Sequence, residues 1–222
     1  VILGIVQVVT GSVGGVAHWA HLGGFAAGAA VAYKLRLPEA AASDGVREEI
    51  GKLASSGAYE LAAARAIEEA EKAPGEAAAQ ELAAVHCGAT AKFANRVAEY
   101  WLRALRLHIA AQQYEGALRC YGKLVSVYGT AQVPPPVRIA LAEAQVCLRN
   151  PGGAISILRT VLEEKTSASM RAEAAFRAGE IAAMHLQVRE LARQYFSYVV
   201  RYCPDSRQAL EAEDWLRRLG VS

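Results

Sequence analysis

The sequence predicts an all-α protein in which a membrane-spanning helix is followed by a solenoid of paired helices. The first observation is a run from Val1 to Tyr33 without any Lys, Arg, Asp or Glu, which is long enough for a helix to cross a bilayer. The second is the helical spacing of apolar residues beyond position 47, where no segment shows the sustained alternation of a strand. The third is the recurrence of similar segments at nearly constant intervals.

Residues 1–37 are predicted to be the C-terminal part of a helical membrane domain. We expect a helix tail over residues 1–9, a glycine-rich loop over residues 10–15 and the last span over residues 16–36. A signal peptide is disfavoured because the run lacks a basic leading region and is too long. The chain starts at Val1 within this apolar run, which indicates a piece of a longer protein.

The charges that follow the span predict its orientation. Lys34 and Arg36 end the uncharged run, and basic residues at the end of a span favour the cytoplasmic side. Pro38 is expected to stop the helix, with a linker over residues 38–46 and a helical domain over residues 47–222. The helix tail and the span together predict an integral, multi-pass membrane protein, and the basic residues predict that its C-terminal domain is cytoplasmic.

The most informative motif is Gly15-Val16-Ala17-His18-Trp19-Ala20-His21, followed by Gly24 and Gly28. Ionisable groups are costly inside a membrane, so a histidine there indicates a functional site. The two glycines lie on one helix face, where they allow a neighbouring helix to approach closely. The segment resembles the last transmembrane helix of the rhomboid intramembrane serine proteases, and the resemblance covers about Val1 to Leu37. It implies that His21 is the catalytic base.

The resemblance also implies the chemistry and the partners. A rhomboid protease cleaves transmembrane protein substrates in the lipid bilayer with a Ser-His dyad and uses no cofactor. The family's serine comes from a Gly-x-Ser-Gly segment two helices earlier, and this chain has no such segment, so the resemblance implies a nucleophile upstream of Val1. Ser12 lies in the predicted loop and is not that serine. His18 and His21 are spaced like a metal-binding pair, but no third ligand accompanies them, and we predict no metal.

Two other classes of function stay open at this point. One is an inactive rhomboid-like membrane protein, and the other is a membrane-anchored scaffold. Retention of His21 favours the active protease. The formal net charge of +2 gives no reason to expect a nucleic-acid partner.

The C-terminal domain is predicted to be helical throughout, without a β-sheet. Apolar residues at helical spacing predict helices over residues 47–72, 76–88 and 91–111, and Pro74-Gly75 separates the first two. Residues 206–219 are expected to form the closing helix that a solenoid needs at its end.

Three segments of this domain place a large apolar residue four positions after an alanine: Ala117 with Tyr121, Ala154 with Leu158, and Ala192 with Phe196. The alanines recur at intervals of 37 and 38 residues. This pattern resembles the second helix of tetratricopeptide (TPR) repeats, although the interval exceeds the usual value of about 34. The resemblance implies a concave surface that binds a protein or peptide.

The remaining metal-binding residue types predict no site. The cysteines show no paired spacing, and buried free thiols in a reducing cytosol are expected for Cys87, Cys120, Cys147 and Cys203. The histidines of the C-terminal domain are expected to be structural, which applies to His86, His108 and His185.

Overall fold

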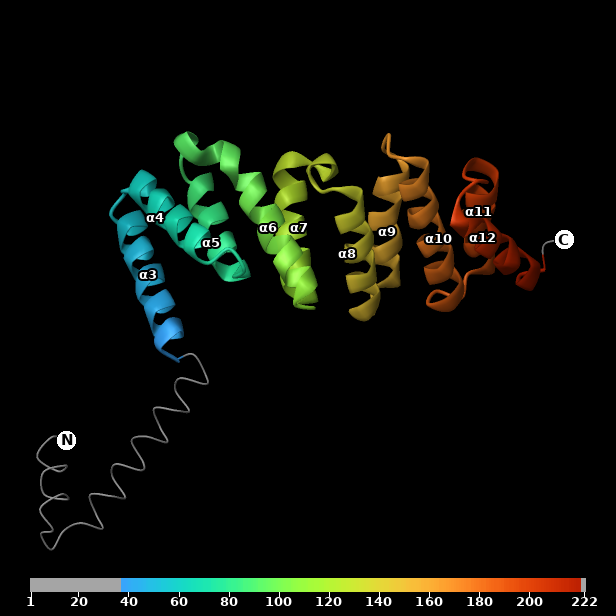
Figure 1. Cartoon of the computed structure of the whole chain (residues 1–222), viewed down its shortest axis with the longest axis horizontal. Helices are drawn as coiled ribbons and strands as arrows, with labels where there is room; N and C mark the ends of the chain where they lie inside the picture. The colour runs from blue at the N-terminus through green and yellow to red at the C-terminus, as the bar shows by residue number, and fades with distance from the viewer. Residues whose placement is uncertain (1–36, 221–222) are drawn as a thin grey trace, which may run out of the picture. The chain divides into compact units, whose positions relative to one another are not determined.

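The computed structural model describes residues 37–220, and this part of the chain is helical without any strand (Figure 1). The helices are α3 (Leu37–Ser55), α4 (Tyr59–Lys72), α5 (Ala77–Gly88), α6 (Val97–Ala110), α7 (Tyr114–Tyr128), α8 (Pro135–Cys147), α9 (Pro151–Leu162), α10 (Ala168–Met184), α11 (Arg189–Tyr202) and α12 (Arg207–Arg218), with short 3-10 helices η1 (Ala91–Arg96) and η2 (Thr130–Gln132). The prediction of an all-α fold is confirmed for these residues. None of the helices described is long and apolar enough to cross a membrane, and the predicted span over residues 16–36 lies outside them.

The chain divides into two compact units, residues 1–58 and residues 59–222. In the first unit the structure describes α3, which covers the predicted linker over residues 38–46, so that segment is helical. Two ion pairs at helical spacing lie along α3, Asp44 with Arg47 and Glu48 with Lys52. Such exposed pairs each stabilise a helix by only about 0.3–0.5 kcal/mol.

The prediction of one continuous helix over residues 47–72 is wrong. The chain leaves the helical conformation after Ser55 and re-enters it at Tyr59. Gly57 has a φ of 83°, a left-handed conformation that glycine adopts without steric cost and that commonly ends helices. The hydroxyl of Ser56 donates to the carbonyl of Leu53 at 2.8 Å and satisfies one acceptor at this helix end.

The other predicted boundaries agree more closely with the structure. The break at Pro74-Gly75, the helix after it and the helix within residues 206–219 are confirmed by α5 and α12. The helix predicted over residues 91–111 begins instead as η1, and α-helical geometry starts only at Val97. Thr90 starts η1 because its hydroxyl accepts a hydrogen bond from the backbone N–H of Lys92.

In the second unit the helices follow one another side by side in sequence order (Figure 1). Each helix packs against the next, and further contacts join α6 to α8, α8 to α10 and α10 to α12. Alternate helices therefore form a continuous row. The intervening helices α7, α9 and α11 carry the three repeated alanines, Ala117, Ala154 and Ala192, all of which are fully buried.

The core of the C-terminal helices is centred on Phe196 of α11. Its ring lies 5.6 Å from the ring of Phe176 and 5.4 Å from that of Trp215, between centroids. Gly179 of α10 faces the same ring, and a Cβ at this position would lie only 2.6 Å from the nearest ring carbon of Phe196. Glycine therefore allows α10 and α11 to pack closely at this point.

We expect Gly179→Ala to lower the free energy of unfolding by about 1–3 kcal/mol, because the confined ring of Phe196 has little space to move away. Urea denaturation measures the change. Gly122→Ala is the matched control: Gly122 lies within α7, and nothing comes within 4 Å of a Cβ built there. The control should be neutral or stabilise by up to about 1 kcal/mol. Equal effects of the two substitutions would contradict the packing argument.

Candidate interaction site

The site residues predicted from the rhomboid resemblance, His21, Gly24 and Gly28, lie outside the described residues. The same holds for His18 and Ser12. Their assignment stays a prediction. The structure instead allows candidate sites to be sought in the helical domain.

A groove of about 210 Å³ lies between α8 and α10 in the row of alternate helices. Its apolar lining comes from both helices: Ile139, Ala142, Val146, Ile181 and Met184. Met184 is 53% exposed, whereas Ala142 is almost fully buried. The groove therefore combines an accessible apolar side chain with a buried apolar base, as ligand-binding hollows commonly do.

The residues that line the groove lie on one face of each helix, because they are spaced three or four positions apart. On α10, Arg177, Ile181 and Met184 follow one another at intervals of four and three residues. On α8, Glu143 and Cys147 are four residues apart. Residues at these intervals share a helix face, so the apolar and charged residues line the same groove.

The charged part of the groove contains more carboxylates than cations. Arg177 Nε lies 3.0 Å from Glu173 Oε1 and 3.9 Å from Glu143 Oε1, and its Nη1 lies 3.2 Å from Glu180 Oε2. Burial raises the pKa of Glu180 above its ordinary value, while the charge of Arg177 opposes this shift. Of these three carboxyl groups, Glu143 and Glu180 line the groove, so two carboxyl groups there face one guanidinium. This excess of carboxyl groups makes the groove suited to a cationic ligand.

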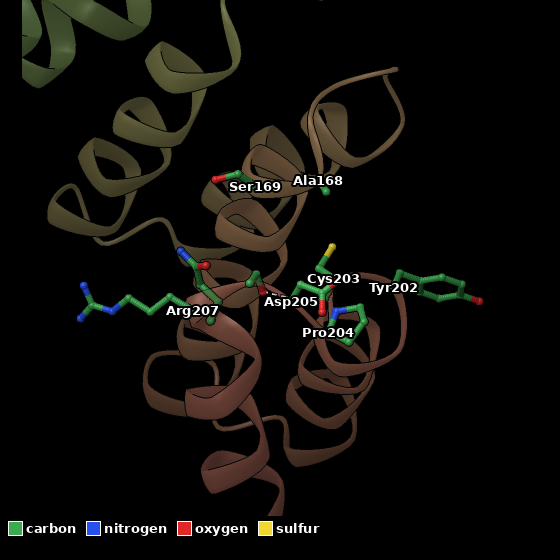
Figure 2. A pocket seen from close by; sticks show the side chains of 9 residues that line it. Ala168, Ser169, Tyr202, Cys203, Pro204, Asp205 and Arg207 are labelled. Carbon is green, nitrogen blue, oxygen red and sulfur yellow. Dashed lines mark hydrogen bonds between the residues drawn. The ribbon is translucent and has the colours of Figure 1, made fainter.

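A second hollow, of about 450 Å³, lies where the turn between α11 and α12 meets the start of α10. Figure 2 shows that the long side chains of Tyr202 and Arg207 extend in opposite directions, while shorter residues such as Ser169 and Pro204 lie between them. Among the residues that line this hollow, no charged groups converge on a common point. We therefore assign the candidate interaction site to the α8–α10 groove.

All four cysteines are free, as predicted, and Cys87, Cys120 and Cys203 are buried. Cys147 differs from the prediction because it is exposed and lines the groove. His185 lines it as well. Burial and the nearby carboxylate of Glu81 raise the pKa of Cys120 to about 12, so its thiol is protonated at neutral pH.

The groove residues were missed in the sequence, although a signal for them is present. Charged residues recur within the alanine-rich helix α10 at Glu173, Arg177 and Glu180, which places them along one face. Such a pattern is equally typical of a solvated helix face. Only the proximity of α8 in the structure distinguishes a groove from a solvated helix face.

No protein-family model and no curated protein sequence matches this chain. Over residues 37–220 the structure defines the class: this part of the chain is all-helical, and its helices from α4 to α12 pack in sequence order.

Proposed function

We propose that this chain is the C-terminal part of a rhomboid-type intramembrane serine protease that carries a TPR-like interaction domain. The observation that carries the proposal is the motif Ala20-His21-x-x-Gly24-x-x-x-Gly28 within an uncharged run of membrane-spanning length. In this proposal the substrates are transmembrane proteins and the C-terminal domain is cytoplasmic.

The proposed mechanism follows from what a serine hydroxyl needs. It is a weak nucleophile until a base accepts its proton, and imidazole suits this role because its unperturbed pKa is about 6.5. His21 accepts the proton from a serine upstream of this chain and returns it to the departing amine. Gly24 and Gly28 allow the serine-bearing helix to approach within hydrogen-bond reach of His21. This chemistry uses no cofactor.

The TPR-like assignment is supported by the alternation of the helices. The repeated alanines fall on α7, α9 and α11, while α6, α8, α10 and α12 contact one another in succession. The pairs α6–α7, α8–α9 and α10–α11 are then three repeats, and α12 is the closing helix. In such an array each pair buries its apolar face against its neighbours, and one face of the array is available to a ligand.

The residues of the α8–α10 groove indicate the chemical class of this ligand. Its apolar base and its excess of carboxyl groups suit a protein segment in which basic residues accompany a large apolar residue. The proposed partner is therefore a basic, amphipathic peptide segment, whose apolar side chain packs against Met184 and Ile181.

Binding of a fluorescent synthetic peptide with alternating pairs of leucine and lysine tests this assignment by anisotropy. We expect Glu143→Lys to weaken binding at least about tenfold, because a cation–carboxylate contact worth about 1.4 kcal/mol is lost and a repulsion is added. Attachment of a bulky maleimide to the exposed Cys147 should block binding.

The matched control is Glu213→Lys, which makes the same charge change at an exposed position of α12 outside the groove lining. It should leave the affinity within about twofold of the unsubstituted chain. Equal weakening by both substitutions would show that only the net charge matters and would contradict the groove assignment.

A further inference from the structure

Three residues with metal-binding side chains meet where α5, α6 and α7 pack together. Glu81 comes from α5, His108 from α6 and Cys120 from α7, and their ligand atoms all lie within 4.8 Å of one another. His108 Nε2 lies 2.5 Å from Glu81 Oε1, although the two residues are 27 positions apart in the sequence. The helix packing therefore assembles a carboxylate, an imidazole and a thiol at one point.

The cluster is largely enclosed but has one accessible side. Cys120 is fully buried and His108 is 7% exposed, while 26% of the Glu81 side chain is exposed. Burial favours metal binding because the surrounding apolar helices exclude competing water. The partly exposed carboxylate of Glu81 is therefore the ligand group through which the cluster faces solvent.

The imidazole of His108 is held in the orientation of a metal ligand. Its Nδ1 lies 2.7 Å from Gln113 Oε1, so a hydrogen bond on that nitrogen leaves Nε2 directed at the cluster. Metal-binding histidines almost always donate their second ring N–H to such an acceptor. Gly116 makes room for the ring, because a Cβ at this position would lie 2.7 Å from Nδ1.

We propose that Glu81, His108 and Cys120 bind one divalent transition-metal ion of the zinc class, with water as the fourth ligand. Sulfur, imidazole and carboxylate ligands in tetrahedral geometry are those that zinc prefers. The usual bond lengths place ligand atoms about 3.3–3.6 Å apart, which the cluster can reach. The carboxylate and imidazole separate by about 1 Å as the ion replaces the hydrogen between them.

Such an ion would link three consecutive helices and so stabilise this end of the helical domain. Because its ligands bind in their deprotonated forms, metal uptake releases protons, including that of the Cys120 thiol. The site is independent of the proposed dyad, since none of its residues belongs to the rhomboid-like segment. Sequence spacing does not indicate it, because the three ligands come from three separate helices.

Titration of the full 222-residue chain with Co²⁺ tests the proposal, because a cobalt–thiolate bond gives a charge-transfer absorption band. We expect one equivalent of Co²⁺ to produce the band and Zn²⁺ to abolish it by displacement. Zinc at about 100 times its dissociation constant should raise the melting temperature by about 5–10 °C. Absence of both the band and the thermal shift would overturn the proposal.

Substitutions identify the ligands. Cys120→Ala should remove the band, whereas Cys147→Ser, at the exposed cysteine, should retain it. Gln113→Ala leaves all three ligands in place and should weaken metal binding about 10–100-fold. If circular dichroism shows that Cys120→Ala does not fold, the affinities of Gln113→Ala and Glu81→Gln for Co²⁺ test the ligand assignment instead. Three results would contradict the proposal: a band that persists in Cys120→Ala, a band that is lost in Cys147→Ser, or a band that neither Gln113→Ala nor Glu81→Gln affects. Any of them would show that the hydrogen-bonded cluster has only a structural role.

Discussion

His21→Ala, made in the full-length protein, is expected to lower cleavage of a model transmembrane substrate by about 10³-fold or more. A serine without its base keeps its proton and stays a weak nucleophile, so the loss should appear in the chemical step. Gel analysis of the cleavage products in membranes measures the effect. Membrane insertion, assayed by extraction, should be unchanged because a smaller and less polar side chain replaces the imidazole.

Ser12→Ala is the matched control for this experiment. Ser12 is the serine nearest to His21 in the sequence, but it lies in the predicted loop over residues 10–15. We expect this variant to cleave the substrate at the unsubstituted rate. Undiminished cleavage by His21→Ala would remove the catalytic assignment. Cleavage absent from the unsubstituted full-length protein would favour an inactive rhomboid-like protein or a membrane-anchored scaffold.

Phe196→Ala is expected to lower the free energy of unfolding by about 3–5 kcal/mol. The ring is fully buried, and its neighbours Phe176 and Trp215 belong to α10 and α12, so its removal leaves a cavity at the junction of three helices. The rings of Phe196 and Trp215 are stacked with an angle of 8° between their planes, and this contact is lost as well. Urea denaturation followed by circular dichroism measures the change.

Tyr202→Ala provides the comparison within the same helix. Tyr202 is 55% exposed and contacts the ring of Tyr198. Its loss should cost less than about 1 kcal/mol, because most of its surface is already in water. Similar costs for Phe196→Ala and Tyr202→Ala would mean that the C-terminal helices are not stabilised through Phe196.

The helices of the C-terminal domain could be predicted largely from local signals. Apolar spacing gave the helical class, and Pro74-Gly75 marked a true boundary because proline and glycine both disfavour helix interiors. The break at Gly57 was missed because a single glycine within a helical pattern is compatible with a continuing helix. The left-handed φ that ends α3 is a property of the folded backbone.

The sites differ in how far sequence could find them. The His21 motif is contiguous, so it can be recognised from residue order, and it lies outside the described part of the chain. The Glu81, His108 and Cys120 cluster has no such local spacing, and each residue by itself is typical of a helix. Its residues come together only because α5, α6 and α7 pack in succession.

The principal contacts in residues 59–220 join helices that are close in the sequence. A domain built in this way can gain or lose a whole helix pair without changes to a common hydrophobic core, since each pair packs only against its neighbours. The length of the domain and its ligand preference can therefore evolve separately. Duplication of a pair changes how far the domain extends, while substitutions in a single groove change what it recognises.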